Sequence, residues 1–209
     1  MTYNKKDHYH QKAKEEGFLA RSAYKLQEIQ KKFKLLRNGS KVLDLGCAPG
    51  AWTQVSLPLV GPQGLVVGID LENVIVLKDP RFRFIHGDAF RLKPADLPEG
   101  PFDCVLSDMA PKTSGVKVRD QALSAALCMH ALETAKLHLK KGGSLVVKLF
   151  EGEDCNHVRK EIEKQFNALK LFRPESTRTA SKEIYLVATG KKYGPPVAEA
   201  PPAAKETAD

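Results

Sequence analysis

The sequence predicts a single α/β domain built on a mostly parallel β-sheet with helices on both faces. The first observation is a set of seven short runs rich in β-forming residues, at 41–46, 65–70, 82–88, 102–108, 144–150, 169–174 and 183–190. The second is a set of helical patterns between these runs, at 51–60, 119–140 and 155–168. Repeated β-α alternation is typical of a doubly wound sheet. The third observation is size, because 209 residues, 42% of them hydrophobic, suffice for one full core.

The two ends of the chain differ from the central domain in composition. Residues 1–19 are basic and polar, so we expect a mobile leader, and residues 20–192 form the predicted domain. Residues 193–209 hold prolines and alanines without an apolar period, which predicts a disordered tail. The leader has no apolar central region, and no run approaches the roughly 20 apolar residues of a membrane helix. We therefore expect a cytoplasmic protein with no membrane contact.

The first strong helical pattern covers residues 21–36 and contains a narrow apolar stripe. Its members are Leu26, Ile29, Phe33 and Leu36. At roughly 100° per residue, Lys25 falls near this stripe and should point inward or along its rim. Tyr24 lies opposite the stripe, where it would stack on a base or be exposed.

Positive charge is concentrated at the start of the chain. The formal net charge is +8, and residues 1–37 hold ten Lys or Arg residues against four acidic ones. Such a segment suits a polyanion such as RNA, because neutralised phosphates release counterions. A solvated helix surface explains the same charges, so charge alone decides nothing. The four cysteines form no C-x-x-C pair and the six histidines are scattered, so we expect reduced cysteines and no metal site.

The strand 144–150 contains one charged residue, Lys148. Leu145, Val147 and Leu149 alternate with Val146 and Phe150, so both faces of this strand are apolar. A strand of that kind lies inside a covered parallel sheet, where an unpaired ammonium is strongly disfavoured. Lys148 either extends to water along its long stem or is required there by chemistry.

Acidic residues end four of the predicted strands. They are Asp44, Asp70, Asp88 and Asp108. Parallel strands end at one edge of the sheet, where open α/β folds bind their ligands, so these acids should share a site. Aspartates that merely form turns are the alternative for any one of them.

The turn "DLGCAPG" at 44–50 connects the first strand of the sheet to a helix. Its glycines have the spacing G-x-x-x-G, whereas a dinucleotide fingerprint requires G-x-G-x-x-G. Asp70 follows Gly50 by 20 residues and ends the next strand, where a carboxylate can accept both hydroxyls of a ribose. The ligand is therefore expected to contain a nucleoside without the pyrophosphate of a dinucleotide.

Several motifs of the chain resemble those of a known family. The segment "VLDLGCAPGAW" is similar to the cofactor motif of Rossmann-like S-adenosylmethionine methyltransferases. The segments "LSDMAP", "SLVVKLF" and "SKEIYLVATG" resemble the FtsJ family of RNA ribose 2′-O-methyltransferases, and the resemblance covers about residues 20–192. It implies a seven-stranded sheet with an antiparallel last strand. It also implies a catalytic tetrad at the matching positions Lys25, Asp108, Lys148 and Glu183.

The resemblance further implies where S-adenosylmethionine would bind. Gly50 and Trp52 would lie near its methionine end, with Asp70 on the ribose, Asp88 at the adenine amine and Asp108 near the sulfonium. Trp52 is the only tryptophan and is equally well explained as a core aromatic.

The reaction implied is methyl transfer from S-adenosylmethionine to a ribose 2′-hydroxyl, with Lys148 binding and deprotonating the acceptor. The bacterial branch of the family acts on large-subunit ribosomal RNA. The expected partner is therefore ribosomal RNA or the large ribosomal subunit, and the protein is expected to be a monomer.

Four alternatives to this reading remain open. They are 2′-O-methylation of tRNA, an RNA-binding assembly factor with incidental activity, a nicotinamide-dependent oxidoreductase and an amino-methyltransferase. The G-x-x-x-G spacing disfavours the oxidoreductase, and "DMAP" lacks the aromatic residue of amino-methyltransferase sites.

Overall fold

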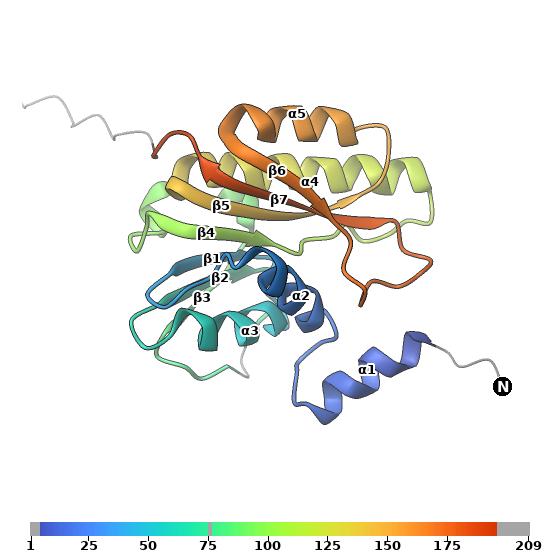
Figure 1. Cartoon of the computed structure of the whole chain (residues 1–209), viewed down its shortest axis with the longest axis horizontal. Coiled ribbons are helices and arrows are strands. Elements are labelled where there is room, and N and C mark those ends of the chain that lie inside the picture. Colours follow the sequence, from blue (N-terminus) through green and yellow to red (C-terminus); the bar gives the residue numbers. More distant parts are fainter. Residues whose placement is uncertain (1–4, 75–76, 196–209) are drawn as a thin grey trace, which may run out of the picture.

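The computed structural model describes residues 5–74 and 77–195 and contains one seven-stranded sheet (Figure 1). Its strands follow the order β3-β2-β1-β4-β5-β7-β6. Their bounds are β1 Lys41–Leu45, β2 Leu65–Asp70, β3 Phe82–His86, β4 Phe102–Ser107, β5 Leu139–Phe150, β6 Phe166–Phe172 and β7 Glu183–Lys191. The first five strands pair in parallel, and β7 is antiparallel to both β5 and β6. The predicted α/β fold with an antiparallel last strand is confirmed.

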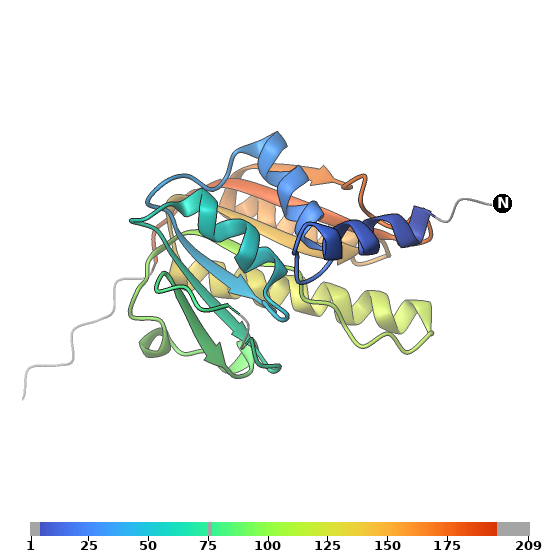
Figure 2. The same ribbon diagram turned by 90° about the horizontal axis from the view of Figure 1, so that it is seen from below.

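Helices cover both faces of the sheet (Figures 1 and 2). The helices are α1 Lys5–Glu15, α2 Ala23–Phe33, α3 Ala51–Val60, α4 Lys117–His138 and α5 Cys155–Gln165, with short 3₁₀ turns at Ala89–Arg91 and Pro94–Asp96. The apolar side chains of α2 and α3 pack on one face, and those of α4 and α5 pack on the other. Among the described residues, no helix is both long and apolar enough to cross a membrane.

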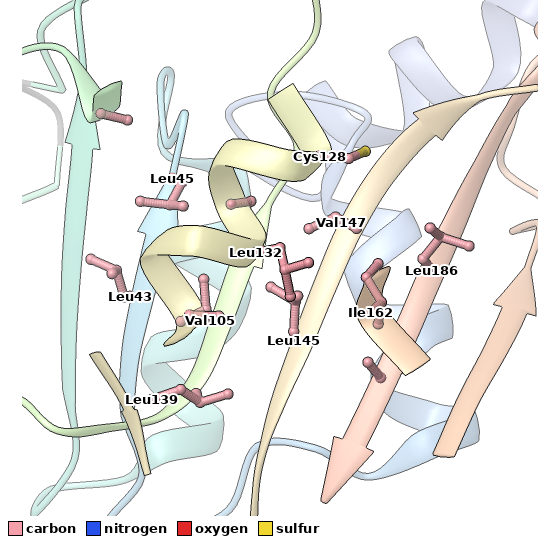
Figure 3. Close-up of a cluster of buried hydrophobic side chains, with 14 of the residues drawn as sticks. Leu43, Leu45, Val105, Cys128, Leu132, Leu139, Leu145, Val147, Ile162 and Leu186 are labelled. Carbon is pink, nitrogen blue, oxygen red and sulfur yellow. The ribbon is translucent and has the colours of Figure 1, made fainter. Parts of the chain in front are cut away.

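Strand β5 contributes to both hydrophobic layers, as its sequence predicts. Leu145 and Val147 face Leu132 of α4 and Ile162 of α5 in the layer drawn in Figure 3. Val146 belongs to the layer beneath α2 and α3. Lys148 follows Val146 by two positions and so lies on the same face of the strand, the face that α2 covers.

Two of the predicted helix ends were wrong. Helix α4 stops at His138, and β5 begins at Leu139 instead of residue 144. The Lys191 ammonium donates to the carbonyls of Lys136 and Leu139, at 2.7 and 2.9 Å, so a residue of β7 caps the end of α4. Helix α5 likewise ends at Gln165, because Phe166 already pairs with Lys191 in the sheet.

The predicted mobile leader contains helix α1, which the sequence analysis missed. Ala13 is 2% exposed, and the ring of Tyr9 lies 5.4 Å from that of Tyr24 on α2. The helix was missed because aromatic contacts, rather than an apolar stripe, hold it. Residues 1–4 of the leader, and residues 196–209 of the predicted disordered tail, lie outside the described residues.

Candidate active site

Lys148 lies at the carboxyl end of the central strands and is 7% exposed. Its ammonium donates to the carboxylate Oδ1 of Asp108 at 2.9 Å and also to the Asp108 carbonyl. Asp108 follows the last residue of β4, the strand that neighbours β5. The lysine therefore does not extend into water, and its position is explained by the paired acid.

Lys25 and Glu183 form a second ion pair beside the first. Lys25 comes from the first turns of α2 and Glu183 is the first residue of β7. Their side chains are 11% and 12% exposed, and the two groups are in direct contact. The structure thus brings together all four residues of the predicted tetrad as two adjacent ion pairs from four separate segments.

Tyr185 connects the two ion pairs, and the sequence analysis did not identify it. Its hydroxyl donates to Oδ1 of Asp108 at 2.7 Å, and the Lys25 ammonium lies 5.9 Å from its ring centre. The residue is fully buried and is the direct neighbour of Lys148 in the β5–β7 register. A signal was present, because residues two apart on a strand share a face and Tyr185 follows Glu183 by two.

The electrostatics of the site favour an ionised Asp108. Burial raises the pKa of Asp108, but the charges of Lys148 and Lys25 and the hydrogen bonds from Lys148 and Tyr185 bring it below its ordinary value. Burial and the neighbouring Asp108 carboxylate raise the pKa of Tyr185 well above its ordinary value. The phenol consequently stays a hydrogen-bond donor to a permanent carboxylate.

A pocket of about 340 Å³ opens beside the tetrad at the ends of β1, β2, β3 and β4. Asp70, Asp88 and Asp108 all line it, so three of the four strand-end acids share one site as expected. Its volume falls in the range of small-molecule sites. Because Asp108 lines the pocket and also holds Lys148, a ligand in the pocket would reach the tetrad directly.

The pocket carries acceptor groups suited to a nucleoside. Asp70 accepts hydrogen bonds from the amides of Ala48 and Glu72, both at 2.9 Å, which fix its carboxylate and leave a second lone pair on each oxygen. Asp88 accepts the amide of Phe90 at 2.9 Å. At Gly46, φ is +72° and a Cβ would lie 2.5 Å from Met109 Cγ, so only glycine allows this close approach. These acceptors fit the hydroxyls and amine of an adenosine group.

Two residues predicted to bind the cofactor lie apart from this pocket. Trp52 is 2% exposed, donates its indole N–H to the Ser22 carbonyl at 2.9 Å and packs against Tyr185. This arrangement favours the core interpretation of Trp52. Gly50 is not among the residues that line this pocket, and a Cβ there would lie 2.7 Å from Leu77.

Asp44 is also placed differently from the expectation. It is fully buried beneath the rim and accepts a hydrogen bond from Thr53 at 2.8 Å, while its Oδ1 has no partner among the described residues. Burial raises its pKa to about 7.

Tyr24 is neither exposed nor available to stack on a base. It is 5% exposed, and its hydroxyl donates to Glu16 at 2.8 Å. The expectation was wrong because α1 and the following turn cover this side of α2. Among the described residues, no group of three or more His, Cys, Asp or Glu side chains could hold a metal ion.

The sequence matches one family model and a number of known proteins. The family model described as FtsJ-like methyltransferase matches residues 18–191. A protein of Desulfatibacillum aliphaticivorans named "Ribosomal RNA large subunit methyltransferase E" is 50% identical, with 90% of this chain and 92% of that protein covered. A protein of the same name from Bdellovibrio bacteriovorus is 47% identical, with 92% and 100% covered.

Solved structures show the same fold. A structure from Plasmodium falciparum described as a ribosomal RNA methyltransferase has a TM-score of 0.73 and 27% identity, covering 83% of this chain and 98% of that one. Aeropyrum pernix fibrillarin with bound S-adenosylmethionine has a TM-score of 0.60 at 17% identity, covering 80% and 76%. This second likeness concerns the fold alone.

Proposed function

The chain belongs to the FtsJ-like methyltransferase family, and from this premise we propose that it methylates the 2′-hydroxyl of a ribose in large-subunit ribosomal RNA. The methyl donor is S-adenosylmethionine. The observation that carries the proposal is the buried Lys148–Asp108 pair at the wall of a nucleoside-sized pocket.

The residues of the pocket fit the cofactor. Asp70 would accept the ribose hydroxyls and Asp88 the adenine amine, while Asp108 brings negative charge to the side where a sulfonium would lie. When bound, S-adenosylmethionine supplies a methyl group on a positively charged sulfur, ready for in-line displacement.

Lys148 is the proposed base. Two of its N–H groups are used by the carbonyl and carboxylate of Asp108, which fixes the direction of the remaining position on nitrogen. In the neutral amine that position is a lone pair, which accepts the proton of the 2′-hydroxyl as the oxygen forms its bond to the methyl carbon. S-adenosylmethionine would keep on its sulfur the electron pair of the bond to the transferred methyl group, and the ammonium formed on Lys148 would be stabilised by Asp108.

Lys25 and Glu183 position the acceptor side of the site. Their mutual ion pair keeps a second cation close to Asp108 without adding net charge to the buried cluster. We assign Lys25 to the acceptor oxygen, where its positive charge would stabilise the developing alkoxide. Glu183 would hold the Lys25 stem in place and accept a hydrogen bond from Thr177, 3.4 Å away.

Ribosomal RNA is supported as substrate by the names of the relatives and by the basic start of the chain. The two named bacterial relatives are large-subunit ribosomal RNA methyltransferases. Helices α1 and α2 carry basic residues in their last turns, at Lys12, Lys14, Lys31 and Lys32, where they could bind phosphates. On this proposal the protein acts as a monomer in the cytoplasm.

The proposal is tested with Lys148→Met, which keeps the side-chain stem and removes the amine. We expect methylation of large subunits from a strain lacking the gene to fall at least 10³-fold, the scale expected for loss of a general base. Calorimetric titration should show S-adenosylmethionine still bound. The matched control is Lys140→Met, on the same strand but paired with Asp103 at the other end of the sheet. Retained turnover in Lys148→Met would reject its role as the base.

Mass spectrometry of digested RNA from wild-type and deleted strains identifies the methylated atom and the RNA. A difference at a base nitrogen, or in tRNA alone, would contradict the proposal. If Lys148→Met restored ribosome maturation in the deleted strain, an assembly factor with incidental activity would be the better description.

A further inference from the structure

A second pocket lies on the other side of the tetrad, between the start of α4 and the start of β7. It has a volume of about 290 Å³. Its walls include Lys117, the first residue of α4, and Lys182, the residue before β7, with the ring of Phe150 at the end of β5. Nothing in the proposed reaction so far uses this pocket.

The two lysines of this pocket face each other. Both side chains are exposed and both line the pocket, one from the start of α4 and the other from the residue before β7. The hydrogen bond and positive charge of Lys182 lower the pKa of Lys117, as expected for like charges in contact. Within the ranges 5–74 and 77–195, neither amine has a carboxylate at ion-pairing distance. Two neighbouring cations at one pocket are stabilised by an anion placed between them.

One acid also lines the pocket, but it is already bound elsewhere. The carboxylate of Asp120 accepts hydrogen bonds from the amide and the hydroxyl of Ser114, both at 2.8 Å, and its residue is 8% exposed. Asp120 therefore holds the loop before α4, and its single negative charge leaves one of the two lysine charges uncompensated.

The pocket is close to the site of methyl transfer. Lys182 directly precedes Glu183 of the tetrad, and Phe150 follows Lys148 by two positions on β5. Two residues of a strand span about 6.6 Å. Phe150 and Glu183 also pair in the β5–β7 register. A polynucleotide with one ribose at Lys148 would therefore place a neighbouring phosphate within reach of the two lysines.

We propose that Lys117 and Lys182 form a subsite for a phosphodiester of the RNA strand, next to the ribose that is methylated. The inference rests on the proposed function and names two positioning residues for its substrate. The anion is bound by two point charges from separate segments, α4 and the β6–β7 connection, so the subsite fixes the strand direction across the tetrad.

The test compares the double variant Lys117→Met/Lys182→Met with the double variant Lys136→Met/Lys164→Met. Both lose two positive charges, but Lys136 and Lys164 pair with glutamates on the outer helices. Two measurements are made: steady-state methylation of large subunits from a strain lacking the gene, and binding of a fluorescein-labelled oligouridylate 12-mer at a series of salt concentrations. Calorimetry with S-adenosylmethionine checks the cofactor site.

For the subsite variant we expect a five- to tenfold higher KM for the subunits at low salt, with kcat and cofactor affinity unchanged. The slope of log K against log salt for the 12-mer should fall by about 0.7 relative to the control variant, the value for one phosphate on a single strand. Equal slopes for the two variants would overturn the inference, even if KM rose, because the lysines would then not bind a phosphate. If neither the wild type nor the control methylates the subunits, the proposed function fails instead.

Discussion

Asp44→Asn should stabilise the protein at neutral and alkaline pH. Asp44 is fully buried near the end of β1. It has one hydrogen bond from Thr53, and its other oxygen has no partner within residues 5–74 and 77–195. Asparagine has the same shape and keeps an oxygen for the Thr53 hydroxyl, but it cannot ionise. The substitution therefore removes a charge that the folded protein accommodates poorly.

The size of the effect follows from the pKa of Asp44, which burial raises from 3.8 to about 7. Between these two values the folded carboxyl keeps a proton that the unfolded chain has lost. The free energy of unfolding then falls as the pH rises, by about 1.4 kcal/mol per unit. Over about three units the loss is roughly 4 kcal/mol, and it is complete above about pH 7. Asp44→Asn lacks this loss, so its advantage should be about 2–4 kcal/mol at pH 8 and vanish near pH 4.

Urea denaturation followed by circular dichroism at several values between pH 4 and pH 8.5 measures this difference. The control is Asp79→Asn, because hydrogen bonds from Arg81 lower the pKa of Asp79 and its substitution should not stabilise at any pH. A pH-independent difference between Asp44→Asn and wild type would refute the reasoning. So would a less stable Asp44→Asn at pH 8.

Three further substitutions test individual contacts. Tyr185→Phe removes a hydrogen bond to Asp108. A hydrogen bond to a charged group is worth roughly 1.5–3 kcal/mol, so kcat should fall at least tenfold and the acidic limb of its pH profile should move to higher pH. An unchanged pH profile would contradict a role of Tyr185 in holding Asp108. Lys191→Met leaves two carbonyls at the end of α4 without a donor and should lower the free energy of unfolding in urea by about 1–3 kcal/mol. Burial lowers the pKa of Lys191 to about 8, so the wild-type free energy of unfolding should rise above that pH. The stability difference between wild type and Lys191→Met should therefore grow between pH 7 and pH 9.5, and a smaller difference at pH 9.5 would contradict this prediction. Trp52→Phe should lower the urea midpoint while leaving S-adenosylmethionine affinity within twofold in calorimetry, since its indole N–H bonds the Ser22 carbonyl inside the core; a tenfold weaker affinity would place it at the cofactor.

Local sequence patterns predicted most of the fold. Strand β2 and helix α3 have the predicted bounds, because an apolar run between turn residues and a helical period both act locally. The end of α4 could not be predicted, because its donor is Lys191, about fifty residues away in the sequence. Helix α1 was missed because its contacts to α2 carry no periodic signal. Long-range contacts decided both cases.

The same distinction applies to the site. Lys148 stood out because it was the only charge in the predicted strand 144–150, which is apolar on both faces. Three of the four strand-end acids followed from the common edge of parallel strands. Lys25 and Glu183 were predicted as site residues from the family resemblance alone, because a charged residue near the end of a helix or strand is common and indicates no function by itself. Tyr185 was missed because a tyrosine in a strand resembles any core aromatic. Its spacing from Glu183 places it on the same face, and the register with Lys148 then shows its role.

The two adjacent ion pairs of the proposed tetrad balance each other's charge. Lys148 and Lys25 are buried cations, and removing the partner of a buried charge costs about 3–5 kcal/mol because the remaining charge has no compensation. Two cations with two anions leave the cluster neutral, so each ion can leave water without a net charge in the core. In the proposed mechanism Lys148 first loses its proton, which would leave the cluster with one net negative charge beside the positively charged cofactor. The proton then taken from the substrate would return the cluster to neutrality as the positive charge of the cofactor is lost. The total charge at the junction of the two sites therefore stays constant during transfer, and the protein does not have to solvate a new charge in a buried position.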